Sequence, residues 1–381
     1  MKRISIVVVS SMIFVLAVIT MVQAQDGWSI QLEPIWMDVY GYDEHVGDIA
    51  SYREEFSADA DENYISDYGT TYEPINLNMK EKFPLRAELT YKKGQWGLGA
   101  SGWLFSTDAS ASGTVTTPEL ESTDTGYIYY ENAVRMWDHT LWPLYNELET
   151  SYSSPVDYWA EDNLEIWTGD LFLSRTLAEK KDSSGNLYLG VKIGSLKTKE
   201  NLGQKQRAFI YDYDYGYTFD NHSTLESTAQ ANGGFMAGPV LGFQGEIQCE
   251  KFGIQGSINQ SVLYGRVEHT GLWKDIDDIL WIDPATDETV WHDVYTGEFF
   301  FSKEEKVALA VTELKLQLLY RVTKRISFSC GAFYSIWWNA PVAPKWSVPG
   351  NWEAGEGTGW RLEERTLKFG GLTLGLRFHF R

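Results

Sequence analysis

The chain has 381 residues, with 53 acidic against 32 basic side chains and a formal net charge of −21. So acidic a chain lacks the basic surface that nucleic-acid binding requires, and its two cysteines are too few for a disulfide framework or a cysteine-rich zinc site. A mean hydropathy of −0.30 excludes a bundle of membrane-spanning helices. The 16 Trp and 22 Tyr favour a protein with many boundaries between apolar and wet surroundings.

The first 24 residues are predicted to be a secretory signal peptide. Lys2 and Arg3 precede a nearly unbroken apolar run over residues 4–22, and small residues stand three and one positions before a cut after Ala24. An uncleaved anchor is the alternative, because the apolar run is nearly long enough to span a bilayer. Residues 25–381 are expected to form one exported domain.

Alternation of apolar and polar residues with a period of two predicts about ten strands in the rest of the chain. The weaker stretches of alternation are 28–41, 96–106, 163–177, 186–198 and 252–268. The clear stretches are 83–92, 241–249, 313–321, 325–338 and 372–380. In the last of them, every even-numbered position from Leu372 to Phe380 is apolar.

Short and long connections alternate between these strands. Turn-like breaks occur near 94, 183, 251 and 323, and long polar stretches cover 42–78, 108–160, 199–232, 271–303 and 342–364. This layout is typical of an all-β transmembrane antiparallel β-barrel with short periplasmic turns and long outer loops. Strands can cross hydrocarbon only in a closed barrel, because every backbone N–H and C=O must find a partner. We therefore expect a Gram-negative outer-membrane barrel, with a large soluble sandwich as the alternative.

Charged side chains on the polar faces of the predicted strands are expected to line the lumen. They are Arg86, Glu88, Lys92, Lys192, Glu246, Glu313, Lys315, Arg321 and Arg377. A ten-stranded barrel is close in size to one whose interior is filled by side chains, and oppositely charged neighbours would then close it. The leading hypothesis is a narrow pore for small solutes or ions. The alternative is a non-conducting structural barrel or surface adhesin.

The long polar stretches are strongly acidic. The fourth of them contains Asp275, Asp277, Asp278, Asp283 and Asp287. Acidic residues around an outer mouth enrich cations, so a conducting barrel is expected to prefer them. Dense carboxylates are also candidate sites for divalent cations that bridge to lipopolysaccharide phosphates. A solvated acidic surface is the simpler explanation, and we predict no metal cofactor because the Asp-x-Asp-x-Asp-Gly calcium motif is missing.

Aromatic residues near the predicted strand ends suit the interfacial girdles of a membrane barrel. They are Trp28, Trp36, Tyr40, Trp96, Trp103, Trp167, Tyr264, Tyr320, Trp337 and Trp338. The last strand also has the pattern of a bacterial outer-membrane assembly signal in Thr373, Gly375, Phe378 and Phe380, although Arg381 follows the final aromatic. The expected partners are the barrel assembly machinery, outer-membrane lipid and lipopolysaccharide.

Four short blocks in the C-terminal half share a family pattern: GPVLG at 238–242, SVLYGR at 261–266, LKLQ at 314–317 and GLTLGLRF at 371–378. In this order they resemble the Legionella-type major outer membrane protein family of pore-forming barrels. His379 departs from the pattern, which has an acidic residue there. The resemblance implies a pore-forming outer-membrane protein and identifies no substrate.

The six histidines form neither a His-x-x-x-His nor a His-Glu-x-x-His spacing. An omptin-like barrel protease is a weaker alternative, in which Asp220 with His222, or His292 with Asp293, would lie beside the acidic loops. The motifs that surround such a site are missing. We therefore expect no enzymatic activity and no cofactor.

Overall fold

The computed structural model describes residues 27–40, 44–58, 64–116, 121–123, 126–136, 139–140, 151–180, 183–212, 217–283, 285–286, 288–347 and 359–380. The predicted signal peptide, Asp287 and Arg381 lie outside these ranges. The named elements within them are all strands. No helix in the described part of the chain is long and apolar enough to cross a membrane.

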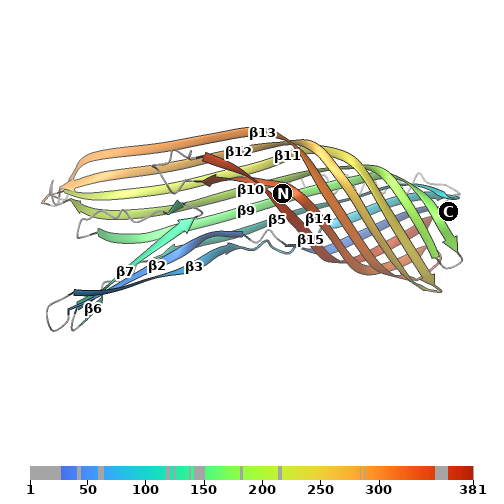
Figure 1. Ribbon diagram of the computed structural model, residues 1–381, viewed down its shortest axis with the longest axis horizontal. Coiled ribbons are helices and arrows are strands. Elements are labelled where there is room, and N and C mark those ends of the chain that lie inside the picture. Colours follow the sequence, from blue (N-terminus) through green and yellow to red (C-terminus); the bar gives the residue numbers. More distant parts are fainter. Residues whose placement is uncertain are drawn as a thin grey trace.

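Ten strands close into an antiparallel barrel (Figure 1). Around the ring they are β1 (Trp28–Tyr40), β15 (Gly359–Phe380), β14 (Ile326–Ser347), β13 (Glu288–Arg321), β12 (Phe252–Asp283), β11 (Tyr217–Cys249), β10 (Ser183–Asp212), β9 (Ser151–Lys180), β5 (Trp96–Val115) and β4 (Leu85–Lys93). β1 closes the ring because it pairs with β15 on one side and with β4 on the other. The predicted ten-stranded antiparallel ring is confirmed.

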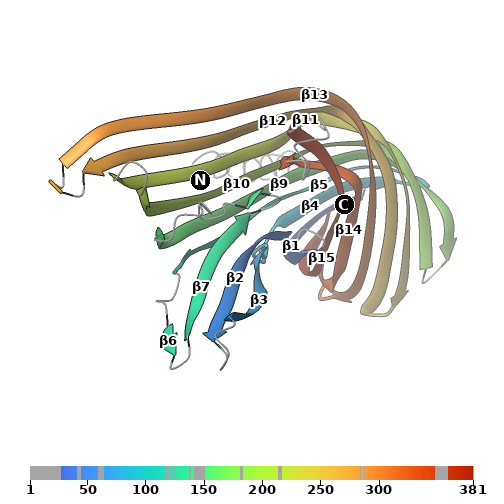
Figure 2. The same ribbon diagram turned by 60° about the vertical axis from the view of Figure 1, so that its left-hand side comes forward.

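Two of the long connections form a second, smaller sheet. Its strands are β2 (Glu44–Ala58), β3 (Tyr64–Leu77), β6 (Glu121–Thr123), β7 (Gly126–Met136) and β8 (His139–Thr140). β2 pairs with β7, so the insertion between β1 and β4 meets the insertion between β5 and β9. Figure 2 shows this sheet at the end of the molecule where β9–β13 project beyond the ring.

The predicted loop lengths are not confirmed, because most of the residues at 199–232 and 271–303 belong to strands. β10–β13 are 30 to 34 residues long and continue far beyond the ring. Alternation of apolar and polar residues marks a strand only where one face is buried. Where both faces carry polar residues the pattern fades, although the strand continues.

We call the projecting part of β9–β13 the extension. A row of directly paired residues crosses the five strands and marks where the extension begins. The row consists of Glu165, Lys197, Asn232, Glu268 and Glu304. The extension is the part of each strand on the side of this row away from the short turns. The four short connections fall where they were predicted, between β4 and β5, β9 and β10, β11 and β12, and β13 and β14. The ring is therefore asymmetric, with turns at one end and a curved sheet at the other (Figure 1).

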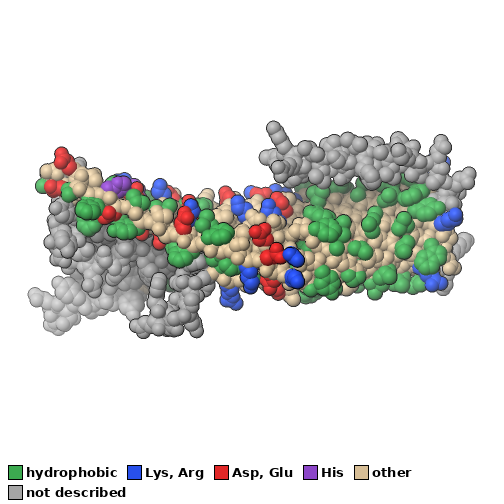
Figure 3. Space-filling view, turned by 90° about the horizontal axis from the view of Figure 1, so that it is seen from above, with side chains coloured by type: hydrophobic (Ala, Val, Ile, Leu, Met, Phe, Trp, Pro, Cys, Tyr) green, Lys and Arg blue, Asp and Glu red, His purple; other side chains and the backbone are tan. Residues whose placement is uncertain are grey.

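The outer surface changes character between the ring and the extension. On the ring, apolar side chains of neighbouring strands lie side by side, as Leu173, Leu189 and Leu241 do in paired positions. These three are 58%, 62% and 53% exposed. On the extension, charged side chains pair across strands, with 2.8 Å between Lys274 Nζ and Glu298 Oε1. Figure 3 shows hydrophobic side chains covering the ring, whereas charged side chains gather next to it and are interspersed with hydrophobic ones along the extension.

Candidate functional site in the barrel interior

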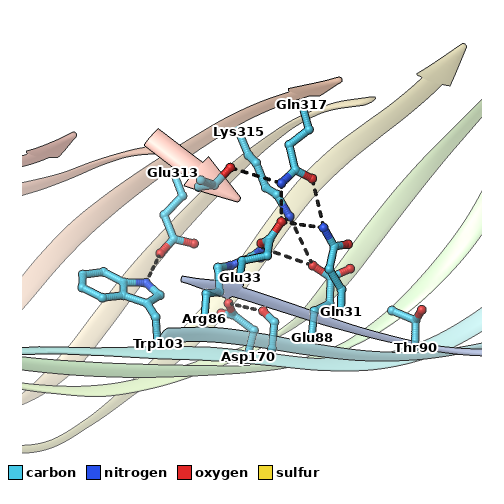
Figure 4. Close-up of polar contacts among 12 residues, drawn as sticks. Gln31, Glu33, Arg86, Glu88, Thr90, Trp103, Asp170, Glu313, Lys315 and Gln317 are labelled. Atoms are coloured by element: carbon cyan, nitrogen blue, oxygen red, sulfur yellow. Dashed lines mark hydrogen bonds and ion pairs between the residues drawn. The ribbon is translucent and has the colours of Figure 1, made fainter. Parts of the chain in front are cut away.

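An ionic layer crosses the interior of the ring and is centred on Glu33 of β1 (Figure 4). Glu33 is 1% exposed. Its Oε2 lies 2.9 Å from Arg86 Nη1 and 2.7 Å from Lys315 Nζ, so two cations from β4 and β13 neutralise it. Glu88 Oε2 lies 3.2 Å from the same Arg86 nitrogen. Gln317 donates a hydrogen bond to Glu33 from β13. A buried carboxylate with this many donors is satisfied without water.

A second part of the ionic layer is centred on Lys192 of β10, whose side chain is fully buried. Its Nζ lies 2.9 Å from Asp170 Oδ1 on β9 and 3.0 Å from Glu313 Oε2 on β13. Glu313 also accepts a hydrogen bond of 3.0 Å from Trp103 Nε1. One ammonium therefore joins carboxylates that approach from strands on opposite sides of the ring.

Arg377 of β15 completes the ionic layer toward the short turns. Its Nε donates to Gln31 Oε1 at 2.9 Å, and its guanidinium also donates to Gln255 of β12. Glu246 of β11 lies 3.6 Å from Arg377 Nη1. The ionic layer thus contains side chains from β1, β4, β15 and each strand from β9 to β13.

Seven of the nine residues predicted to line the lumen lie inside the ring and contact one another or their shared partners. They are Arg86, Glu88, Lys192, Glu246, Glu313, Lys315 and Arg377. Lys92 and Arg321 are instead exposed close to the short turns. Five further polar residues of the ionic layer were not predicted: Gln31, Glu33, Asp170, Gln255 and Gln317. The first four lie in the weakly alternating stretches. The alternation of inward and outward positions also applies to these strands and would have identified them.

An apolar layer lies above the ionic layer, on the side of the extension. Its largest fully buried side chains include Phe105, Trp337 and Phe369. Trp103 packs its ring against Phe333 and Phe369, with centroids 5.8 Å and 5.9 Å apart. The prediction that Trp103 and Trp337 belong to an interfacial girdle is wrong. Both lie on strand positions that face inward, and Trp337 is adjacent to the outward-facing Trp338.

The far end of β14 covers the apolar layer. Asn339 has a positive φ of 54°, and the pairing of β14 with β15 shifts between Trp337 and Ala340. Beyond this bend, β14 contacts the inner sides of β10, β11 and β12, and Ala340, Val342 and Ala343 are buried. The start of β15 follows it, with Trp360 stacked on Phe301 of β13 at 6.2 Å between centroids. Figure 1 shows these ends of β14 and β15 beside β11 and β12.

The predicted outer-mouth acids lie along a strand of the extension. Asp275, Asp277 and Asp278 are part of β12, and Asp283 ends it. Burial, together with the neighbouring Asp277 carboxylate, raises the pKa of Asp275. Asp278 Oδ1 lies 2.6 Å from His292 Nε2 on β13. The described acids therefore follow one strand and do not encircle a mouth.

The Asp220 and His222 pair of the protease alternative lies at the tip of the extension. Asp220 accepts hydrogen bonds from Arg207 Nε at 2.7 Å and Nη2 at 2.5 Å, and its Oδ1 is 3.2 Å from His222 Nε2. The Arg207 guanidinium holds the pKa of Asp220 below its usual range. His292 and Asp293 are consecutive on β13 and so point to opposite faces. Among the described residues, no group of three His, Cys, Asp or Glu side chains is arranged to hold a metal ion.

The predicted assembly signal lies in β15, beside the seam where the ring closes. Thr373 is fully buried and accepts a hydrogen bond of 3.3 Å from Gln317. Phe378 and Phe380 alternate with it and share the outward face of Leu374, and they pair with Ile30 and Trp28 of β1. Their role in assembly stays a prediction.

No protein-family model matches the chain, and no curated protein matches it. Among solved structures, it is similar to the outer membrane protease OmpT from Escherichia coli, with a TM-score of 0.40 and 11% identity over 93% of this chain and 97% of that chain. It is also similar to the P. putida toluene transporter TodX, with a TM-score of 0.26 and 6% identity over 94% and 91% of the two chains. It is also similar to a Pseudomonas aeruginosa FadL homologue, with a TM-score of 0.21 and 10% identity over 94% of this chain and 91% of that chain. Likenesses with TM-scores this low indicate no function for this chain.

Proposed function

We propose that the protein is an outer-membrane β-barrel of a Gram-negative bacterium with a closed lumen, and that it serves as a non-conducting barrel that presents the extension at the cell surface. The observation that carries this proposal is the filled interior. Lys192 and Gln317 in the ionic layer, and Trp337 and Phe369 in the apolar layer, have no surface accessible to water. The central side chains of both layers are therefore inaccessible to water, whereas Glu88 and Glu246 of the ionic layer keep 15% and 27% of their side-chain surface exposed. We infer that no path for a hydrated ion passes through both layers.

The outer surface of the ring supports insertion into a membrane. Large apolar side chains are exposed on it, among them Leu171, Leu316 and Leu374 at 62%, 59% and 63%. A contiguous apolar surface of this kind is costly in water. Exposed aromatics border it at both ends, as in the girdles of membrane barrels. Toward the extension they are Trp36, Tyr40, Trp167, Tyr264 and Trp338, and toward the short turns Trp96, Phe252, Tyr320 and Phe328.

The width of the apolar band fits a bilayer. On β10 it runs from the turn at Ser183 to Ser195, which pairs with Trp167 at the border of the extension. A tilted strand needs about 9 to 11 residues to cross the hydrocarbon. Leu189 lies midway between these limits, so in this proposal its side chain faces the middle of the bilayer. Lipid and lipopolysaccharide would surround the band, and the barrel assembly machinery would bind β15.

The substitution Leu189→Arg distinguishes a barrel that is inserted in a membrane from one whose outer surface faces water. We expect Leu189→Arg to lower the free energy of unfolding by about 2–4 kcal/mol, because the charge would lie at the bilayer midplane. Val294→Arg is the matched control on the extension, since Val294 is 57% exposed and Leu189 is 62% exposed. We expect that control to change the free energy by less than about 0.5 kcal/mol. Urea titrations of the protein folded in lipid vesicles measure both, and equal, small effects would count against a membrane barrel.

A narrow, cation-preferring pore is the second candidate. It is favoured by the polar composition of the ionic layer and by the resemblance to the Legionella-type major outer membrane protein family. This candidate requires a state in which the ion pairs of Glu33 and Lys192 separate and the far end of β14 moves away. Such a state would prefer cations because the extension beyond the lumen carries Asp275, Asp277 and Asp278.

A further inference from the structure

β13 has an open edge along the extension. It pairs with β14 only from Ala310 to Arg321, because β14 bends inward at Asn339. Pro341 and Pro344 follow this bend and have no N–H to donate. From Glu288 to Leu309, the only described strand that pairs with β13 is β12. Figures 1 and 2 show β13 as the outermost strand of the extension.

Two backbone hydrogen bonds near the turn show which residues of β13 direct their N–H and C=O groups to the open edge. Arg321 N donates to Lys251 O at 2.7 Å on the β12 side, and Val322 N donates to Ile326 O at 3.0 Å on the β14 side. Backbone groups alternate between the two sides of a strand, and the pairing with β12 has no register shift from Tyr320 to Trp291. The even-numbered residues therefore direct N–H and C=O to the open edge. They are His292, Val294, Thr296, Glu298, Phe300, Ser302, Glu304, Lys306 and Ala308, and all are exposed.

The part of this edge farthest from the short turns lacks the lysines and prolines that usually protect an edge strand from pairing with another strand. Natural edge strands carry Lys or Pro, or are short or bulged. Residues 291–302 contain no Lys, Arg or Pro and pair with β12 without a bulge, and Val294, Tyr295 and Phe300 are 57%, 59% and 72% exposed. An unprotected edge with large exposed apolar side chains is suited to strand addition, in which an extended peptide pairs with the sheet.

The charge around the edge indicates the chemistry of the partner. β13 contributes Asp293 and Glu298 over this stretch, and the neighbouring part of β12 contributes further carboxylates at Asp275, Asp277 and Asp278. Two lysines lie near this stretch: Lys274, which is paired with Glu298, and Lys303, which follows Ser302 on β13. We infer that the β13 edge from 291 to 302 binds an extended polypeptide segment of another protein in which apolar residues alternate with Lys or Arg.

A second copy of this chain fits the edge poorly. It would bring the same acidic residues face to face. Two copies in one membrane would also be related by an axis parallel to the barrel, so their β13 strands would point the same way and could not form the symmetric antiparallel pair. The parallel orientation of the two copies rests on the proposed membrane location, whereas peptide binding in detergent does not.

The test uses a fluorescent peptide of about nine alternating Val and Lys residues, the length of a strand. Its binding to the full chain in detergent is measured by fluorescence anisotropy at about 0.15 M ionic strength, where remote surface charges are screened. Thr296→Pro removes one N–H from the open edge, a position where an edge strand tolerates proline. We expect it to weaken binding at least about tenfold. Thr296→Val keeps the N–H and should leave binding within about twofold of the parent.

A second probe separates strand addition from simple charge attraction. The same peptide N-methylated at every residue keeps its charge but has no backbone donors, and we expect it to bind at least about tenfold more weakly than the unmodified peptide. Failure of the parent to bind the unmodified peptide at about 1 mM would overturn the inference, as would equal binding to Thr296→Pro. A parent dimer that Thr296→Pro dissociates would assign the edge to a second copy instead. Because the assay is done in detergent, none of these outcomes depends on how Leu189→Arg behaves.

Discussion

Replacing Lys192 with Met should lower the free energy of unfolding by about 3–5 kcal/mol, because removing one partner of a buried ion pair leaves an uncompensated charge. Here two carboxylates would be left, Asp170 at 2.9 Å and Glu313 at 3.0 Å from the missing ammonium. Both are buried in the interior of the ring. Urea-induced unfolding of the protein in lipid vesicles measures the loss.

Two further variants isolate the ionic contribution of Lys192. Lys205→Met changes an exposed lysine of the same strand and should shift the free energy by less than about 0.5 kcal/mol. Combining Lys192→Met with Asp170→Asn and Glu313→Gln removes the stranded charges and should recover most of the loss. A loss below about 1 kcal/mol in Lys192→Met alone would show that water reaches the ionic layer.

Replacing Gly331 with Val should prevent the ring from closing. A Cβ at this position of β14 would meet the carbonyl oxygen of Leu316 on β13, which is backbone and cannot rotate away. The two strands would have to separate in the segment where they pair. We expect the folded fraction, measured by the heat-dependent shift in gel mobility, to fall at least about tenfold, equivalent to about 1.4 kcal/mol.

Gly234→Val is the matched control for Gly331→Val. A Cβ at Gly234 would have no atom within 4 Å, and the residue is exposed on β11. It should fold to nearly the parent level. A normally folded Gly331→Val protein would mean that the contact between β13 and β14 is looser than the structure has it.

The ring was predictable because alternation reports the difference between its two faces. The alternation of apolar and polar positions predicted from sequence alone that Arg86, Lys192 and Glu313 face the barrel interior. Their ion pairs can form because each residue lies at an inward-facing position of a different strand. The alternation did not show which of these side chains contact one another across the ring. Glu33 and Lys315, for example, are far apart in sequence, and their contact depends on closure of the ring.

The extension and the closure of the mouth were not predictable in the same way. The strands of the extension carry polar residues on both faces, so most of 199–232 does not distinguish a strand from a loop. Only the alternation of Tyr with Asp and Gly over 211–217 favours a strand that continues above the membrane. The inward bend of β14 depends on the positive φ of Asn339 and on tertiary packing of Ala340 and Val342. Tertiary packing of this kind leaves no periodic signal in the sequence.

The conductance of the purified full chain in a planar bilayer tests the closed interior most directly. Because Lys192 and Trp337 have no water-accessible surface in two successive layers, we expect no steady current at neutral pH. Membrane insertion is verified in the same preparation by the mobility shift. Stable, ohmic, cation-selective steps from the parent protein would contradict the closed lumen and would favour the narrow pore.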